Sequence, residues 1–499
     1  MNGLRPALLL ATADRYFSLI ASFISLAAVS RLLTPHEIGL AVIGMAICGF
    51  WFRLREFTTA SFLILREDVT QEDIRAAFTV SILLSALLCA ILFAAAGFLA
   101  HAYQQEELAL LLRVLALACF VEVIPGPVLA MFQRELAFGK VALINMSNAA
   151  VGTAATIAFA LLGQGYLSAA FGWLAGVTTS AVLAILLWRD FSVFRPIVRN
   201  WRGAISFGAY SGINLFLAGI YETLPCILIG KLISIGAAAD YTRSLNIVQL
   251  PDKLFLAGVV AVALPAFVNH ARQGNDMKRA YVHASIHITA LQWPALILIS
   301  ILAYPAVSIL LGAQWRNVVP LVQIMALGSV LSFSAALNYP VLVSLGCMRE
   351  VLVRSFIVWP ISALIVSAAA SFGLTAAAFG YGIAIGFQSL ISTYFIRRHI
   401  PLGWLEFARA LRGSFIVTFW TAAGALSALG LYGFRFDLSI AQGVAVGFAG
   451  VGGWLLGLRL TQHPLLTEIL AALRALRPLL AARCWPTQAL KSAGRRIGS

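Results

Sequence analysis

The segment AAFTVSILLSALLCAILFAAAGFLA, residues 76–100, is 25 residues long and contains no charged side chain. A helix needs about 20 predominantly apolar residues to cross the roughly 30 Å hydrocarbon core of a bilayer, so this segment can span a membrane. Similar segments recur along the whole chain, and twelve of them satisfy a strict criterion. A wider count predicts fourteen spans: 7–33, 38–65, 75–101, 108–131, 140–163, 165–188, 203–233, 244–268, 282–311, 318–345, 350–371, 374–397, 407–432 and 437–460.

The composition agrees with a helical membrane protein. Of the 499 residues, 61% are hydrophobic and only 11% are charged, whereas a soluble domain carries about 25% charged residues. This excludes an ordinary soluble enzyme, and the many aromatic residues exclude a disordered chain. The net charge of +15 would suggest a nucleic-acid partner in a soluble protein, but the basic residues follow the ends of apolar segments. We therefore expect membrane lipids, and no nucleic acid, as partners.

The basic residues also predict the topology. With the N-terminus inside, about 25 of the 35 Lys and Arg residues fall on cytoplasmic segments, Arg349 and Arg354 among them. The outside segments carry about five basic residues: Arg31, Lys231, Arg243, Arg316 and Arg435. This asymmetry satisfies the positive-inside rule. It predicts a multi-pass protein of the bacterial inner (cytoplasmic) membrane with both termini cytoplasmic and no extracytoplasmic domain.

The longest inside connections, 189–202 and 398–406, divide the chain. We predict a lobe of six helices over 1–200, a second over 201–400, two further helices over 401–462, and a basic cytoplasmic tail over 463–499. A shift of 200 residues places Arg53-Leu54 over Lys253-Leu254, which suggests a parallel repeat such as transporters contain. Asp14 and Arg15 interrupt the first apolar run, so we interpret it as a retained helix rather than a cleaved signal.

Charged residues within membrane spans are costly and are functional hypotheses by default. The candidates are Asp14, Arg15, Arg53, Arg55, Glu56, Glu122, Glu222, Asp252 and Lys253. Arg15, Arg53, Arg55 and Lys253 would form a cationic cavity for an anionic cargo such as a diphosphate, because guanidinium groups bind phosphate oxygens in bidentate fashion. The acids Asp14, Glu56, Glu122, Glu222 and Asp252 are possible charge partners or ion-coupling groups. An equally open alternative is that these charges only neutralise one another: Arg15 with Asp14, and Arg55 with Glu56 or Glu122.

Other chemistry finds little support in the sequence. His283 and His287 have the i, i+4 spacing of metal ligands, but no carboxylate or cysteine accompanies them in the sequence, so we expect no metal site. The six cysteines form no CxxC pair. Nucleotide-binding and nucleophile motifs are absent from the sequence. We therefore expect no cofactor, no catalytic residue and no enzyme activity, with energy supplied by an ion gradient or the cargo gradient.

Three regions resemble the polysaccharide transporter (Wzx-type oligosaccharide flippase) branch of the multidrug/oligosaccharidyl-lipid/polysaccharide exporter superfamily. The first region is Ser30–Pro35 and Ile38–Leu40, followed by Leu54–Phe57 and Leu63–Ile64; Thr58 stands where the family often has Gly. The second is Leu228–Lys231, Asp240–Arg243, Leu250–Pro251 and Leu264–Ala266, with Glu222 as the nearest acid before the Ile-Gly-Lys block. The third is Gly312, Trp315 and Pro320–Leu321, continuing to Leu345–Gly346.

The resemblance implies an all-α integral membrane fold in which two six-helix lobes surround a central cavity, with two extra C-terminal helices. It also implies that the protein flips an undecaprenyl-diphosphate-linked oligosaccharide, an exopolysaccharide or O-antigen repeat unit, across the inner membrane by alternating access. Related flippases use cavity arginines on early helices, and Arg15 and Arg53 are similar in placement. Polymerase and chain-length proteins of the same pathway are possible partners.

Two other functions stay open at this point. A drug/cation antiporter of the same superfamily needs an acidic cavity, which the intramembrane arginines disfavour. A membrane glycosyltransferase or polymerase usually needs sizeable extracytoplasmic loops that carry catalytic residues, and the predicted outside loops are short.

Overall fold

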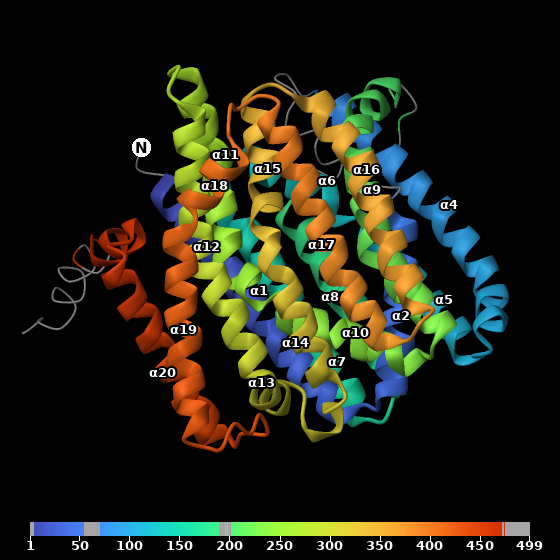
Figure 1. The fold of residues 1–499 in the computed structure, drawn as a ribbon. Coiled ribbons are helices and arrows are strands. Elements are labelled where there is room, and N and C mark those ends of the chain that lie inside the picture. Colours follow the sequence, from blue (N-terminus) through green and yellow to red (C-terminus); the bar gives the residue numbers. More distant parts are fainter. Residues whose placement is uncertain are drawn as a thin grey trace, which may run out of the picture. The chain divides into compact units, whose positions relative to one another are not determined.

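A computed structural model describes residues 4–53, 70–188, 195, 197, 201–471 and 474, without the side chains of 4–9, 11, 201–215 and 255–262. Every regular element within these ranges is a helix (Figure 1). The all-α class is therefore confirmed. The chain folds into two compact units, one of residues 1–250 and 303–396 and one of residues 251–302 and 397–499.

Unit 1 holds most of the helices. They are α1 (Leu4–Leu32), α2 (Pro35–Phe52), α4 (Gln71–Tyr103), α5 (Glu107–Val121), α6 (Pro125–Arg134), α7 (Phe138–Leu161), α8 (Ser168–Leu187), α9 (Trp201–Leu232), α10 (Ile235–Val248), α13 (Ala303–Leu310), α14 (Val318–Gly328), α15 (Phe333–Ser344), α16 (Met348–Ala370) and α17 (Leu374–Arg397). Unit 2 holds α11 (Ala257–Arg272), α12 (Met277–Ile301), α18 (Trp404–Ala410), α19 (Arg412–Gly430) and α20 (Ile440–Leu460). The predicted extra C-terminal pair corresponds to α19 and α20.

Twelve helical segments within the described residues are long and apolar enough to cross a membrane. The two remaining predicted spans, 203–233 and 244–268, correspond to α9 and to the α10–α11 stretch. The eighth predicted span began too late, because α10 starts at Ile235, where Ser234 accepts a hydrogen bond from the Ala237 N–H at 3.0 Å. Asp240 and Arg243 lower the mean hydropathy of α10, so a hydropathy count did not identify the start of this helix.

Several of the long helices are interrupted. The predicted fourth span breaks between α5 and α6 ahead of Pro125, and the predicted tenth span passes through a 3-10 turn, Ser329–Ser332, between α14 and α15. The predicted eighth span contains a π-helical turn, Asp252–Leu256, directly after Pro251. Proline removes a backbone donor and so weakens a helix locally, and π-helical turns are frequent at functional sites.

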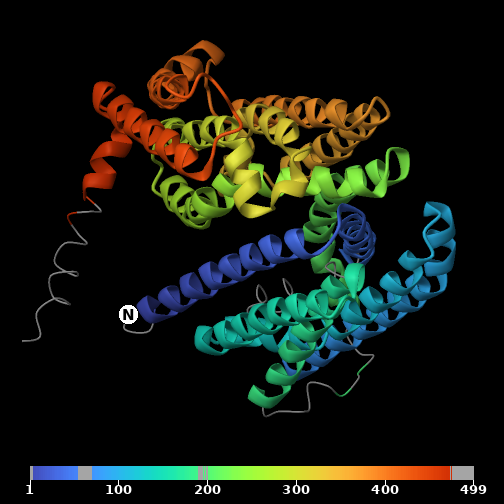
Figure 2. The ribbon, with the colours of Figure 1, turned by 90° about the horizontal axis from the view of Figure 1, so that it is seen from below.

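The helix pairs of unit 1 recur in the two predicted lobes. In residues 1–200, α1 packs on α7 and α2 packs on α5, while in residues 201–400 α9 packs on α16 and α10 on α14. Figure 2 shows the blue and teal helices of residues 4–187 grouped together, with the helices of residues 318–397 grouped apart from them. The repeated pairing supports the internal repeat, and the lobe boundaries near 200 and 400 remain a prediction.

A capping box explains the sharp turn from α1 into α2. The Thr34 N–H donates to Glu37 Oε2 at 2.8 Å, and the Glu37 N–H donates back to Thr34 Oγ1 at 3.3 Å. Pro35 occupies the first turn of α2, where its missing N–H costs nothing. The sequence Ser30–Pro35, which carries part of the family resemblance, therefore forms the α1–α2 corner, where the end of α1 turns into the start of α2.

Unit 2 is built on α12. Thr289 donates to Ser414 Oγ of α19 at 2.8 Å, and the Trp454 indole of α20 donates to the Ala290 carbonyl at 2.9 Å. Gly453 and Gly457 of α20 lie against the backbone of α19, as small residues do where membrane helices pack closely. The two C-terminal helices are therefore held to α12 by side chains as well as by the chain itself.

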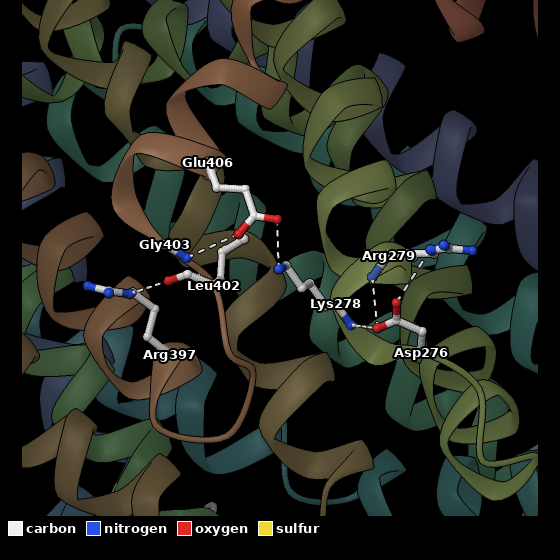
Figure 3. A network of polar contacts seen from close by, with 7 residues as sticks. All are labelled: Asp276, Lys278, Arg279, Arg397, Leu402, Gly403 and Glu406. Atoms are coloured by element: carbon white, nitrogen blue, oxygen red, sulfur yellow. Dashed lines mark hydrogen bonds and ion pairs between the residues drawn. The ribbon is translucent and has the colours of Figure 1, made fainter.

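A polar network fixes α18 to the start of α12 (Figure 3). Lys278 Nζ lies 2.7 Å from Glu406 Oε1, and the Gly403 N–H donates to Glu406 Oε2 at 3.4 Å. Arg397 Nε donates to the Leu402 carbonyl at 2.5 Å, which folds the connection between α17 and α18. Asp276 caps α12 by accepting from the Lys278 N–H at 2.9 Å. The network holds the 397–406 connection against α12.

This network predicts a pH dependence. The hydrogen bond from Lys278, followed by the Gly403 N–H, lowers the pKa of Glu406 below its ordinary value of 4.5. A lowered pKa in the folded state stabilises the fold at pH above that ordinary value, and this contribution disappears as the pH falls through the lowered pKa. We expect Glu406→Gln to lower the melting temperature slightly at pH 7 and to match the parent protein at acid pH. A difference that persists when Glu406 is protonated would contradict this assignment.

Candidate transport site

The structure pairs two of the predicted charged residues. Arg53 caps the C-terminal end of α2, and its Nη2 forms an ion pair with Glu222 Oε2 of α9. The Arg53 side chain is 24% exposed and the Glu222 side chain 57% exposed. Gly219, one turn before Glu222, leaves room for the arginine, because a Cβ atom there would lie 2.8 Å from Arg53 Nε. The pair joins a helix of residues 1–200 to a helix of residues 201–400.

Asp14 of α1 has a hydrogen-bond partner on a neighbouring helix. Asn145 of α7 donates to Asp14 Oδ2 at 2.9 Å, so an amide of the neighbouring helix binds this carboxylate. Arg15 is exposed on α1, beside Tyr16, which is 48% exposed. Arg15 therefore presents its guanidinium on the surface of α1 rather than in the packed interior.

Arg55 and Glu56 lie outside the described residues, so their predicted roles stay predictions. Glu122 lies at the break between α5 and α6, where its N–H donates to the Ala118 carbonyl at 3.0 Å. Asp252 and Lys253 belong to the π-helical turn of unit 2, where Gln292 of α12 donates to Asp252 Oδ1 at 2.7 Å.

Hydrogen bonds to backbone carbonyls close the end of unit 1 that carries the α1–α2 corner. We call this region the outer seam, because the charge pattern predicts it outside. Arg31 donates to the Ile309 carbonyl at 2.6 Å, and the Trp315 indole donates to the Ser30 carbonyl at 2.8 Å. The other contacts are Gln314 to the Ser30 carbonyl and to the Leu33 carbonyl at 3.1 Å, Tyr103 to the Ile227 carbonyl at 2.8 Å, and Lys231 to the Ala102 carbonyl.

The outer seam unites the regions that resemble the transporter family. Ser30 and Arg31 come from the first region, Lys231 from the second and Trp315 from the third, and the Arg243 guanidinium lies 5.8 Å from the Trp315 ring. Each hydrogen bond of the outer seam joins residues 1–200 to residues 201–400. Sequence motifs that are 200 residues apart therefore meet at one end of the helices.

Helix α2 packs on α5 of residues 1–200 and on α9 and α10 of residues 201–400. At the outer seam Gly39 touches the start of α10, and a Cβ atom at Gly39 would lie 2.7 Å from the Ile235 carbonyl carbon. At the other end of α2, the rings of Phe50 and Phe216 lie 5.4 Å apart, next to the Arg53–Glu222 pair. Backbone contact at one end and a charge pair at the other hold α2 against α9 and α10.

The burial of two arginines was not predicted from the sequence. Arg243 of α10 and Arg354 of α16, which were counted on an outside and a cytoplasmic segment, are only 7% and 6% exposed. Arg354 of α16 donates from Nε and Nη2 to Ser392 Oγ of α17 at 2.9 and 2.8 Å. The burial of Arg354 was not predictable, because a hydropathy count does not identify an acceptor 38 positions further along the chain.

Aromatic rings cover Arg354. Its Cζ lies 5.7 Å from the Trp359 ring, and Trp359 packs against Tyr221 of α9 with 5.5 Å between ring centroids. Within the described part of the chain no ion pair joins Arg354 to a carboxylate. The Ser392 hydroxyl and the face of the Trp359 ring thus hold the buried Arg354 guanidinium.

The Arg354–Ser392 contact predicts a stability effect. Ser392→Ala removes the acceptor of both guanidinium hydrogen bonds in a buried site. We therefore expect the free energy of unfolding to fall by about 1–3 kcal/mol. Thermal unfolding in detergent measures this difference, with Ser427→Ala, an exposed serine of α19, as the matched control. Equal melting temperatures for the two variants would show that the Ser392 hydroxyl does not stabilise Arg354.

The sequence and the fold of the chain are similar to those of known proteins. A family profile described as polysaccharide biosynthesis protein matches residues 28–320, more than half of the chain. The chain belongs to this family. The predicted resemblance to polysaccharide transporters is confirmed, and the matched range includes every residue of the outer seam.

Curated relatives of the chain agree with this family membership. The chain is 21% identical over 314 residues to the lipopolysaccharide biosynthesis protein WzxC of Escherichia coli, with 62% of this chain and 63% of the relative aligned. It is 23% identical over 300 residues to the teichuronic acid biosynthesis protein TuaB of Bacillus subtilis, covering 57% and 59%. It is 22% identical over 329 residues to the succinoglycan biosynthesis transport protein ExoT of Rhizobium meliloti, covering 65% and 66%. The chain thus spans about three fifths to two thirds of these relatives.

Solved structures show the same fold. The chain matches a lipid II flippase MurJ in an inward closed conformation with a TM-score of 0.74 and 12% identity, over 92% of this chain and 99% of that one. An inward-facing multidrug resistance transporter of the MATE family matches with a TM-score of 0.62 and 14% identity, over 81% and 99%. At such low identity these likenesses establish the fold, and the predicted fold class is confirmed.

Proposed function

We propose that this protein is a flippase that moves an undecaprenyl-diphosphate-linked oligosaccharide, an exopolysaccharide or O-antigen repeat unit, from the inner to the outer leaflet of the bacterial inner membrane. The observation that carries the proposal is the junction between the two sets of helices. It is closed by the outer seam at one end and contains the Arg53–Glu222 pair further along α2. Family membership and the transport name of the ExoT relative support the same function.

Alternating access requires the outer seam to open and close. Its six hydrogen bonds contribute about 0.5–1.5 kcal/mol each, so together they are worth several kcal/mol. Reversing a two-state population from 99:1 to 1:99 requires about 5.5 kcal/mol. The summed free energy of these hydrogen bonds is therefore large enough to favour the closed state strongly, yet small enough for the outer seam to open.

The Arg53–Glu222 pair offers a way for cargo to bias that equilibrium. A diphosphate carries more negative charge than a carboxylate and binds guanidinium in bidentate fashion. Cargo that binds Arg53 would displace Glu222 and so release α2 from α9. Binding is then stronger in the state with the helices apart, which is the differential affinity that any ligand-driven change needs. In this scheme Arg15, exposed on α1, assists Arg53, and Arg55 and Lys253 remain further candidates for the cationic cavity.

We also propose the predicted topology, with both termini cytoplasmic and the outer seam towards the outside. Polymerase and chain-length proteins of the same pathway are the proposed partners on the outer side. The antiporter alternative needs an acidic cavity, whereas the Glu222 carboxylate at this junction is paired with the Arg53 guanidinium. The glycosyltransferase or polymerase alternative predicts polymer synthesis without lipid transport, which the assay below separates.

The experiment is a clean deletion of the gene followed by isolation of lipid-linked oligosaccharides. We expect one undecaprenyl-diphosphate oligosaccharide to accumulate on the inner leaflet and the surface polymer to disappear. Accumulation of an incomplete oligosaccharide would indicate a glycosyltransferase, and accumulation of single repeat units on the outer leaflet would indicate a polymerase.

A further inference from the structure

A histidine and carboxylate cluster lies in unit 2, outside the proposed transport site. His283 and His287 are one helical turn apart on α12, and their rings lie 4.3 Å from each other. Glu468 comes from the segment that follows α20, and its Oε1 lies 3.2 Å from His287 Nε2. One donor atom from each of the three residues lies within 4.8 Å of the other two. The structure thus supplies the carboxylate that the sequence around the two histidines lacked.

Hydrogen bonding identifies the free nitrogen of His287. Its Nδ1 lies 2.8 Å from the main-chain carbonyl of His283, and a carbonyl can only accept, so Nδ1 carries the proton. In a neutral ring Nε2 then bears a lone pair, and it points towards the carboxylate of Glu468. Nε2 is buried and makes no hydrogen bond. A lone pair and a carboxylate oxygen 3.2 Å apart repel each other unless a proton or a metal ion lies between them.

We propose that His283, His287 and Glu468 bind a divalent transition-metal ion of the zinc type. Imidazole nitrogen and carboxylate oxygen are ordinary zinc ligands, and a ligand histidine whose second nitrogen donates to a backbone carbonyl is the usual arrangement around such ions. With metal–ligand bonds of about 2.0–2.2 Å, the three donor atoms need to approach by roughly 1 Å. Glu468 is exposed at the end of a long side chain and can make this movement.

His463 positions the cluster rather than binding the ion. Its Nδ1 accepts from the Leu465 N–H at 3.2 Å, and its Nε2 lies 3.4 Å from Ser414 Oγ of α19. Both ring nitrogens are therefore occupied, and the ring is only 2% exposed. His463 fixes the start of the helical turn that carries Glu468. A bound ion would consequently tie the segment after α20 to α12.

Metal binding to the full-length protein in detergent tests this proposal. The protein carries an affinity tag without histidines, is stripped with a chelator, and is titrated with Zn²⁺ against a competing chromophoric chelator. We expect one ion per chain, and at least tenfold weaker binding by His287→Ala, His283→Ala and Glu468→Gln. His101→Ala, an exposed histidine at the end of α4, is the matched control and should bind as the parent protein does.

A second measurement guards against misfolded variants. Zn²⁺ should raise the melting temperature of the parent and of His101→Ala but not that of Glu468→Gln, which keeps the size of the side chain. Absence of Zn²⁺ binding at micromolar concentration would overturn the proposal and leave a protonated His287 paired with Glu468. Binding that survives all three substitutions would also overturn it. The outcome is independent of whether the protein is a flippase.

Discussion

Arg53→Ala is expected to reduce export of the lipid-linked oligosaccharide about a hundredfold while the protein still inserts into the membrane. A hydrogen bond to a charged group is worth about 1.5–3 kcal/mol, and a bidentate guanidinium–diphosphate contact contains two, whereas each 1.4 kcal/mol changes binding tenfold. Surface polymer in a deletion strain that carries the variant measures export, and immunoblots of membranes measure insertion. Arg113→Ala, an exposed arginine of α5, is the control and should export normally.

Substitution of Glu222, the partner of Arg53, is expected to change the affinity for cargo in the opposite direction. Glu222→Gln removes the competitor for the guanidinium, so the variant should bind the lipid-linked cargo more tightly than the parent protein. Direct binding of the cargo to purified protein distinguishes the two variants. If Arg53→Ala binds and exports normally, or if Glu222→Gln weakens binding, the pair does not bind cargo and serves only to neutralise charge.

Gly39→Val is the second substitution with a large expected effect. A Cβ atom at Gly39 would meet the backbone of Ile235, which cannot rotate away as a side chain can. We therefore expect the outer seam to stay open and transport to fall to background. A single cysteine in place of Gln314, in an otherwise cysteine-free protein, should become reactive towards a membrane-impermeant thiol reagent added from outside.

The same helix offers a matched control for this substitution. Gly49 lies ten residues further along α2, and a Cβ atom there would meet nothing within 4 Å. Gly49→Val adds the same volume and the same β-branched side chain to α2, yet it should transport normally. Equal transport by the two variants would show that close contact between α2 and α10 is not required.

The helices and the charges within the predicted spans were identifiable from the sequence. Apolar length determines which segments are helical in a membrane, because every backbone group must be satisfied within the segment. The same reasoning singled out Arg53 and Glu222 as charges within predicted spans, since intramembrane ionic residues are rare. The predicted resemblance located Ser30–Pro35 and Trp315, which the structure then brings together at the outer seam.

The pairings themselves were not predictable. Arg53 and Glu222 are 169 positions apart, and neither hydropathy nor helical periodicity relates residues at such a separation. The burial of Arg354 was not predicted, because nothing in the sequence marks Ser392 of α17 as its hydrogen-bond acceptor. Glu468 was counted only as part of a basic tail, and its place beside His287 depends on how the chain leaves α20. Tertiary packing decides each of these contacts.

Transport by the purified protein tests directly whether it flips the lipid-linked oligosaccharide and whether Arg53 is required. The protein is reconstituted into lipid vesicles with undecaprenyl-diphosphate oligosaccharide, and a sugar-cleaving enzyme added outside reports which leaflet holds the cargo. We expect the inner-leaflet cargo to become cleavable with the parent protein but to remain protected with Arg53→Ala. Cargo that stays protected with the parent protein, or becomes cleavable equally with both, would contradict the proposed flippase function.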